Sequence, residues 1–243
     1  MHFQAQNEKN HFYHLNIISS SKASVHCFVN GFPAFEILSF SSAANTVPID
    51  LYLAGTNTLE VTLDGTTEEI TAEGSISQYE KGEMADASDG KPGIAPFKLF
   101  GKNKKTEITF TTNGFDFSYL FKNAPIITNE EEVKKYATYL LELLKNKNTK
   151  ALADEMIPKF KDYAKVYGKP EEKFKTDFET FFNDKFLKRP EDLIVSTEII
   201  IEPLAQKRIY KLHLKDKKGL FVRGGYYFEV YIALIEGKLK IVR

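Results

Sequence analysis

The length, composition and charge of this chain exclude several classes of protein. Its 243 residues suffice for one or two domains, each able to bury a core without cross-links. A net charge of zero gives no overall attraction to nucleic acid or to an anionic membrane, and a lone cysteine, Cys27, excludes an intrachain disulfide. We therefore expect no nucleic-acid or membrane partner. The start of the chain lacks the basic and apolar stretches of a signal peptide, so we expect a cytoplasmic protein.

The sequence changes character near residue 125. Residues 1–125 read as strands and turns throughout, and they carry 9 Lys, no Arg and 14 Asp and Glu residues, a net charge of −5. Residues 126–243 carry the balancing +5 and read first as helices and then as strands. We therefore predict two domains, 1–125 and 126–243.

Alternating apolar residues predict the first strands, over 11–18 and 23–29. Val25, Cys27 and Val29 share one face of the second of these strands. Asn30-Gly31 follows between two apolar runs. Because both residues tolerate positive φ, this pair predicts a hairpin turn.

The rest of the first domain contains two more Asx-Gly pairs and one long irregular segment. Asp64-Gly65 and Asn113-Gly114 are further hairpin candidates, the latter between segments 106–112 and 115–121. Gly74, in the middle of a predicted strand, indicates a bulge or a close backbone approach. Segment 82–105 lacks periodicity and reads as a long loop. Such loops are functional, structural or mobile, and loop statistics favour the last two.

Three helical segments are predicted after residue 125. Thr128 and Glu131 have the spacing of a capping box at the start of the first. Pro158 divides the second, 149–167, into two short helices or a kink. The third begins at Pro170, and we assign its apolar stripe to the core; the stripe consists of Phe174, Phe178, Phe181, Phe182 and Phe186.

A strand meander is predicted after the helices, over 193–202, 208–214 and 226–235, and Gly237 turns the chain into a last strand. Helices followed by such a meander resemble the nuclear transport factor two and ketosteroid isomerase superfamily. The segment from Tyr231 to Val242, with its Gly turn and large-basic-apolar alternation, is similar to that superfamily's last two strands. The resemblance implies an α+β cone, with three helices packed on a curved antiparallel sheet around an apolar pocket, and often dimers built on that sheet. Segment 162–174 departs from the family, because it offers little of the strand pair usual there.

The first domain is similar to the jelly-roll accessory domains of glycoside hydrolases. The similarity lies in Val29-Asn30-Gly31, in Ile49-Asp50 and in the Leu-x-Gly-x-Asn-x-Leu-x-Val spacing of residues 53–61. In those domains such residues shape turns and core and do not contact sugar. The resemblance therefore implies an all-β antiparallel sandwich and leaves the ligand open.

No motif that carries chemistry by itself is present. The sequence contains no Cys-x-x-Cys, His-Glu-x-x-His, calcium-loop, phosphate-loop or Gly-x-Ser-x-Gly pattern. His11 and His14 lie three apart on a predicted strand and so point to opposite faces, which argues against a shared metal. We expect neither a metal nor a cofactor.

One polar cluster in the second domain is a candidate pocket. On the predicted strand 226–235, Tyr227, Glu229 and Tyr231 share a face, and we expect Arg208 and His213 to lie nearby on the preceding strand. The isomerase branch of the resembling superfamily pairs a carboxylate base with a Tyr donor, which implies those roles for Glu229 and for Tyr227 or Tyr231. We favour the alternative that this polar face meets water or a partner, because one strand does not prove that groups converge.

These observations favour a non-catalytic binding or interaction protein, whose partner is an unidentified protein or small molecule. The alternative is an isomerase- or hydratase-like enzyme or carrier that uses a pocket in the C-terminal cone. A third hypothesis, carbohydrate binding by the first domain, requires exposed aromatic rings in a cleft. An exposed Glu229 favours the binding protein, and a Glu229 enclosed in an apolar cavity favours the enzyme. A homodimer through the C-terminal sheet is open under each hypothesis.

Overall fold

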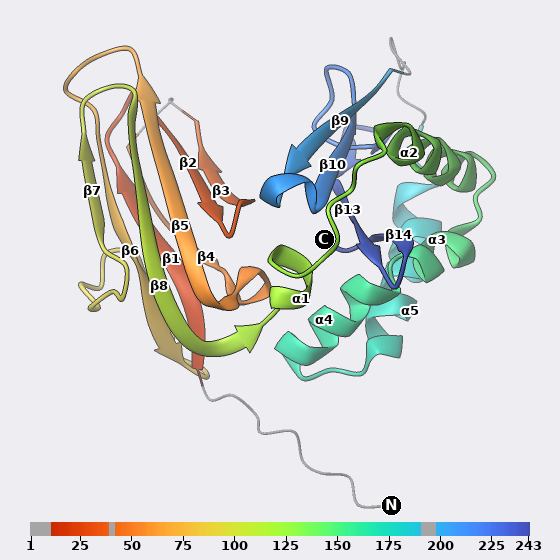
Figure 1. Cartoon of the computed structure of the whole chain (residues 1–243), viewed down its shortest axis with the longest axis horizontal. Helices are drawn as coiled ribbons and strands as arrows, with labels where there is room; N and C mark the ends of the chain where they lie inside the picture. Colours follow the sequence, from red (N-terminus) through yellow and green to blue (C-terminus); the bar gives the residue numbers. More distant parts are fainter. Residues whose placement is uncertain (1–10, 39–41, 191–197) are drawn as a thin grey trace, which may run out of the picture. The chain divides into compact units, whose positions relative to one another are not determined.

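The computed structural model describes residues 11–38, 42–190 and 198–243. In these residues the fold is α+β, with 43% strand and 27% helix, arranged as four antiparallel sheets and five α-helices (Figure 1). The chain divides into two compact units, Met1–Lys122 and Asn123–Arg243.

Two four-stranded sheets share one core in the N-terminal unit. Their strand orders are β4-β1-β6-β7 and β3-β2-β5-β8, and every described pairing is antiparallel. Inward side chains of both sheets, such as Leu15, Val25 and Ile76, are fully buried against one another. The strands are β1 (His11–Ser19), β2 (Ala23–Val29), β3 (Phe32–Ile37), β4 (Ala43–Pro48), β5 (Ala54–Gly65), β6 (Thr71–Glu80), β7 (Phe97–Phe100) and β8 (Lys104–Asp116).

The three Asx-Gly pairs have different outcomes. Asn30-Gly31 forms the predicted hairpin turn between β2 and β3, with φ of 53° and 74°. The hairpin predicted at Asp64-Gly65 is wrong, because β5 and β6 belong to different sheets and the chain crosses between them there. A Cβ added to Gly65 would lie 2.6 Å from Ile70 Cδ1, so close packing accounts for this glycine.

The hairpin predicted at Asn113-Gly114 is also wrong, because β8 runs through both residues to Asp116. A register shift of β8 against β5 takes up the irregularity, and a Cβ added to Gly114 would lie 2.9 Å from the Tyr13 ring. The chain then enters a short helix, α1 (Ser118–Phe121), in place of the predicted second strand. The close approach predicted at Gly74 is confirmed, since an added Cβ would lie 2.0 Å from the Asn16 carbonyl oxygen.

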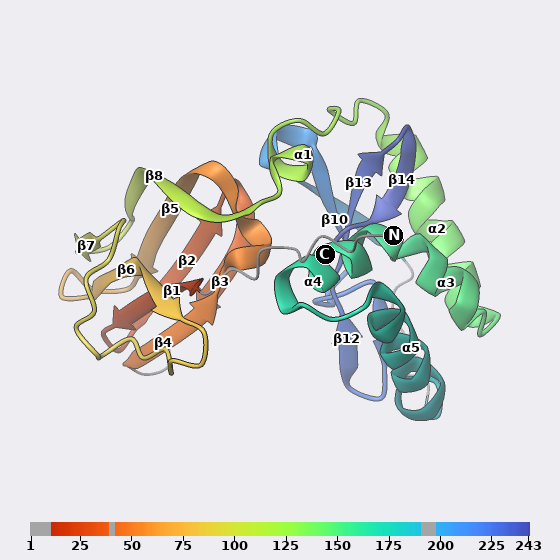
Figure 2. The same cartoon turned by 90° about the horizontal axis from the view of Figure 1, so that it is seen from below.

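A four-stranded sheet with helices on one side forms the C-terminal unit. The sheet order is β14-β13-β10-β9, and α2 and α3 lie along it in Figure 2. A separate hairpin consists of β11 and β12. The strands are β9 (Ile199–Leu204), β10 (Ile209–Leu214), β11 (Phe221–Arg223), β12 (Tyr226–Phe228), β13 (Val230–Ile235) and β14 (Lys238–Ile241). The helices are α2 (Glu130–Lys145), α3 (Thr149–Glu155), α4 (Ile157–Tyr167) and α5 (Glu171–Phe181), the last continued by a π-helical turn at Phe182–Phe186.

The helix boundaries follow local chemistry. Pro158 separates α3 from α4 as predicted, and Gly168 ends α4 in the left-handed region with φ of 63°. The capping-box prediction is wrong by one residue, because the Asn129 side chain accepts the backbone N–H groups of Glu131 and Glu132. Phe181 is 37% exposed, so the predicted apolar stripe is only partly core. The first residues of the strand predicted over 193–202 lie outside the described residues.

Candidate functional site

The predicted strand 226–235 is interrupted at Glu229. The prediction that Tyr227, Glu229 and Tyr231 share one face of a single strand is therefore wrong. Residues 226–228 pair with β11 in the separate hairpin, whereas 230–235 pair with β10 and β14 in the large sheet. Tyr227 and Tyr231 therefore belong to different sheets. The structure does bring Glu229 and Tyr231 together, because the Tyr231 hydroxyl donates to Glu229 Oε2 at 3.0 Å.

The Glu229 carboxylate lies on an exposed face and is paired with a lysine that the sequence analysis did not single out. Its side chain is 40% exposed, and its Oε1 lies 2.7 Å from Lys211 Nζ. Lys211 and Tyr231 lie opposite each other in the β10–β13 register, which is why the two side chains meet at Glu229.

His213 and Arg208, the other predicted pocket residues, make local contacts at the two ends of β10. The His213 ring nitrogen Nδ1 lies 3.1 Å from the carbonyl oxygens of Leu214 and Lys217. Arg208 donates to Gln206 Oε1 at 2.9 Å. The His213 contacts thus join the ring to the backbone of the following turn, and the Arg208 contact joins two neighbouring side chains.

A row of polar side chains lies on the outer face of the β4-β1-β6-β7 sheet. Because Leu15 faces the core, strand alternation turns His14 and Asn16 outward. Register pairs Asn16 with Ser75 and His14 with Ser77 on β6. Asn16 and Ser77 are nevertheless only 5% and 0% exposed. Another part of the chain must therefore cover this outer face.

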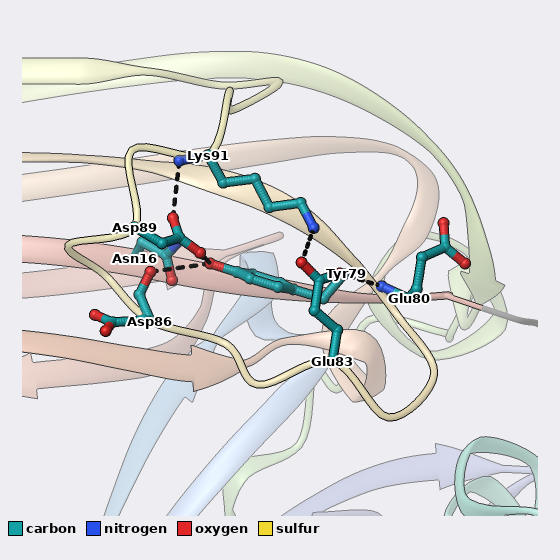
Figure 3. A network of polar contacts seen from close by, with 7 residues as sticks. All are labelled: Asn16, Tyr79, Glu80, Glu83, Asp86, Asp89 and Lys91. Atoms are coloured by element: carbon teal, nitrogen blue, oxygen red, sulfur yellow. Dashed lines mark hydrogen bonds and ion pairs between the residues drawn. The ribbon is translucent and has the colours of Figure 1, made fainter.

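The cover is segment 81–96, which Tyr79 fastens to the sheet (Figure 3). The Tyr79 hydroxyl accepts a hydrogen bond from Asn16 Nδ2 at 2.7 Å. Its single proton points between Asp89 Oδ2 at 3.0 Å and the Asp86 carbonyl oxygen at 3.1 Å. Burial raises the pKa of Tyr79, so this hydroxyl stays protonated and remains a donor.

Lys91 holds the other side of the same segment. Its Nζ lies 4.4 Å from the centroid of the Tyr79 ring and 2.5 Å from Glu83 Oε1, and its backbone N–H donates to Asp89 Oδ1 at 2.8 Å. The Glu80 backbone N–H in turn donates to Glu83 Oε2 at 2.8 Å (Figure 3). Segment 81–96 is thus held by contacts of its own side chains and backbone.

A hollow of about 570 Å³ opens between segment 81–96 and the sheet face. This volume falls in the range of roughly 300–1,000 Å³ that small-molecule sites occupy. A Cβ added to Gly93 would lie 2.1 Å from Ser75 Cβ, so a glycine there lets the segment approach the sheet. The residues around this hollow, called the Asn16 hollow below, include Asn16, Ile18, Ser75, Ala87, Asp89, Lys91, Phe97 and Lys98.

The Asn16 side chain distinguishes this hollow from an ordinary surface depression. Its Nδ2 is used by Tyr79, but its buried Oδ1 has no hydrogen-bond partner in the described part of the chain. Leaving a buried acceptor unpaired costs about 1–3 kcal/mol, so native proteins retain few such groups. A ligand that donates a hydrogen bond would remove this cost.

Each lysine at the hollow is already paired with a carboxylate. Lys98 Nζ lies 2.8 Å from Glu73 Oε2, and both side chains are largely exposed. Lys91 is paired with Glu83. The lining residues Glu73, Asp89, Lys91 and Lys98 sum to zero charge.

Sequence reasoning flagged part of this site and missed the rest. Segment 82–105 stood out as a long loop, although the structure shows that it includes strand β7. Asn16 and Ser75 gave no signal, because alternation shows only that they face away from the core. Their proximity follows from the β1–β6 register, which the sequence does not show.

A second polar cluster in the C-terminal unit joins α2, α3 and β14. Glu155 Oε2 accepts the Tyr136 hydroxyl at 2.7 Å and Lys240 Nζ at 2.9 Å, and its side chain is 14% exposed. Burial, followed by the bond to Glu155, raises the pKa of Tyr136, which therefore stays a donor. The cluster is a satisfied network, and its physical role is to fasten β14 to the helices.

Two further features are absent from the described residues. Within 11–38, 42–190 and 198–243, no group of three or more His, Cys, Asp or Glu side chains has the arrangement of a metal site. None of the helices in these ranges is long and apolar enough to cross a bilayer.

Comparison of the chain with family models, curated proteins and solved structures finds no match, so a functional proposal must rest on the sites themselves.

Proposed function

We propose that this protein is a non-catalytic binding protein whose small-molecule ligand occupies the Asn16 hollow. The observation that supports this most directly is the unpartnered, buried Oδ1 of Asn16, a residue that is 5% exposed and that lines a ligand-sized hollow. The preformed cover supports the same proposal, because an ordered segment spares a ligand the entropy of ordering it.

The geometry gives less support to an enzyme. A carboxylate base of the isomerase kind works in a desolvated pocket, whereas Glu229 is 40% exposed and ion-paired with Lys211. At the Asn16 hollow, the Ser75 hydroxyl lies 3.1 Å from the Ser77 hydroxyl, and among the described residues it has no hydrogen bond to a histidine or carboxylate that could activate it. The aromatic ring in the lining, Phe97, is 7% exposed, which is too little for the ring stacking that carbohydrate binding was expected to need.

We propose in addition that the chain is organised as two domains. The N-terminal β-sandwich is the binding module, and the C-terminal helices and sheet form a second, cone-like module. Each unit has a hydrophobic core of its own, which supports this division.

A thermal-shift screen of diverse small molecules on the full chain tests the proposal. Ala87→Phe introduces a ring at the lining, and Glu229→Gln removes the alternative base. A ligand present at 100 times its Kd stabilises the native state by about 2.7 kcal/mol, enough to raise the Tm measurably. We expect hits to persist in Glu229→Gln and to vanish in Ala87→Phe. Hits that vanish in Glu229→Gln and persist in Ala87→Phe would overturn the proposal.

A further inference from the structure

Two acceptors at the Asn16 hollow have hydrogen-bonding capacity left over. Asn16 Oδ1 is unpartnered. The Asp89 carboxylate accepts one bond from the Tyr79 hydroxyl and one from the Lys91 backbone N–H, which uses two of its roughly four lone-pair sites. A ligand that brings donors would use this capacity.

The Asn16 and Asp89 side chains meet at the Tyr79 hydroxyl. Asn16 Nδ2 and Asp89 Oδ2 both bond the same Tyr79 hydroxyl, at 2.7 Å and 3.0 Å. The two side chains are thus neighbours although they come from a strand and from the covering segment (Figure 3). A ligand of a few atoms with two donors is large enough to reach both.

The charges at the hollow argue against an ionic ligand. An anion would face Asp89 and Glu73, while Lys91 and Lys98 are already paired with carboxylates. A cation would meet a Glu73 that is already paired with Lys98, and would gain only from Asp89, whose carboxylate already accepts two hydrogen bonds. Since the charged lining residues balance one another, the hollow does not require its ligand to bring a charge. Ile18, Pro96 and Phe97 give the hollow an apolar part that suits the carbon skeleton of such a ligand.

We infer that the Asn16 hollow binds an uncharged polar molecule through its O–H or N–H donors, with one donor on Asn16 Oδ1 and a second on Asp89. This inference rests on the proposed function and specifies its ligand class. Hydroxyl groups and amide N–H groups share the required chemistry, and separate probes distinguish them.

An NMR titration of the full-length ¹⁵N-labelled chain tests the ligand class. The hydroxyl probes are glycerol and myo-inositol, and the amide probes are acetamide and N-methylurea. Methylammonium, acetate and inorganic phosphate represent the charged classes. Fragments of this size bind weakly, with a Kd on the order of 1–10 mM, so the titration must reach that range. We expect one uncharged arm to shift the Asn16 side-chain signals and the Gly74, Ser75 and Gly90 amide signals.

Three variants separate binding from folding. Asn16→Leu removes the acceptor, and we expect it to weaken binding by at least about 10-fold, in line with the loss of one hydrogen bond at an enclosed site. Ala87→Phe narrows the hollow without changing the sheet, and Ala85→Phe, on the same segment but outside the lining, is its matched control. We expect loss of binding in Ala87→Phe and retention in Ala85→Phe.

The outcomes distinguish the ligand class from the proposed function. If only a charged probe shifts the signals of the hollow, the inferred class is wrong and the proposed site stands. If no probe of any class shifts them, both are overturned. Binding of an uncharged probe that is unaffected by Asn16→Leu would overturn the role of the Asn16 acceptor.

Discussion

Asn16→Leu should leave the stability of the fold unchanged or slightly higher, although it replaces a buried polar residue. The substitution removes the bond from Asn16 Nδ2 to the Tyr79 hydroxyl, which contributes about 0.5–1.5 kcal/mol. It also removes the unpartnered Oδ1, whose burial costs about 1–3 kcal/mol. Tyr79 keeps Asp89 as an acceptor, so its hydroxyl is not left unpaired. The balance predicts an unchanged or slightly increased free energy of unfolding.

Asn57→Leu is the matched control for this measurement. Asn57 is also fully buried in the N-terminal unit, but its Oδ1 accepts the Ala54 backbone N–H at 2.7 Å and Asn30 Nδ2 at 2.8 Å. Its Nδ2 donates to the Gly55 carbonyl oxygen at 2.9 Å. Replacing it leaves several buried polar groups without a hydrogen-bond partner, so we expect the free energy of unfolding to fall by about 3 kcal/mol or more. Urea unfolding of both variants provides the comparison. A loss of more than about 2 kcal/mol in Asn16→Leu would refute the reasoning, since Asn16 would then be a structural residue.

Three other predictions concern ionisable groups. Burial raises the pKa of Cys27 to about 12, so thiol reagents at pH 8 should leave native protein unmodified and react once urea unfolds it; rapid native labelling would contradict this. Desolvation and the Arg243 guanidinium lower the pKa of Lys159 from 10.5 to about 8. At this site the unfolded chain therefore binds more protons between these values, so the stability of the wild type relative to Lys159→Met should rise from about pH 8 to 10.5. Glu155→Gln removes a carboxylate with two donors and should lower the free energy of unfolding by about 1.5–3 kcal/mol. The control Glu198→Gln, at an exposed pair with Lys215, should have no measurable effect.

Local signals in the sequence were sufficient where local chemistry decides the structure. Pro158 and Gly168 separate and end helices because one lacks a backbone donor and the other tolerates positive φ. The Asn-Gly signal for a hairpin turn failed where tertiary contacts decide the structure. Asn30-Gly31 is a turn, whereas Asn113-Gly114 lies inside β8, where the Asn113 side chain accepts a hydrogen bond from His11 and the glycine makes room for the Tyr13 ring.

The candidate site shows the same limit. Glu229 was singled out from one strand, and the structure splits that strand between two sheets. Asn16 and Asp89 lie far apart in the sequence and meet only because segment 81–96 returns over the β1–β6 face, where the Ile94 backbone N–H donates to the Ile76 carbonyl oxygen at 2.7 Å. No local pattern encodes that return, so neither residue could be selected in advance.

Hydrogen–deuterium exchange of the full chain, with and without a stabilising ligand from the screen, tests most directly where binding occurs. We expect bound ligand to slow exchange in peptides covering residues 72–98 and to leave peptides covering 208–231 unchanged. Protection confined to 208–231 would place the ligand at Glu229 and contradict binding at the Asn16 hollow.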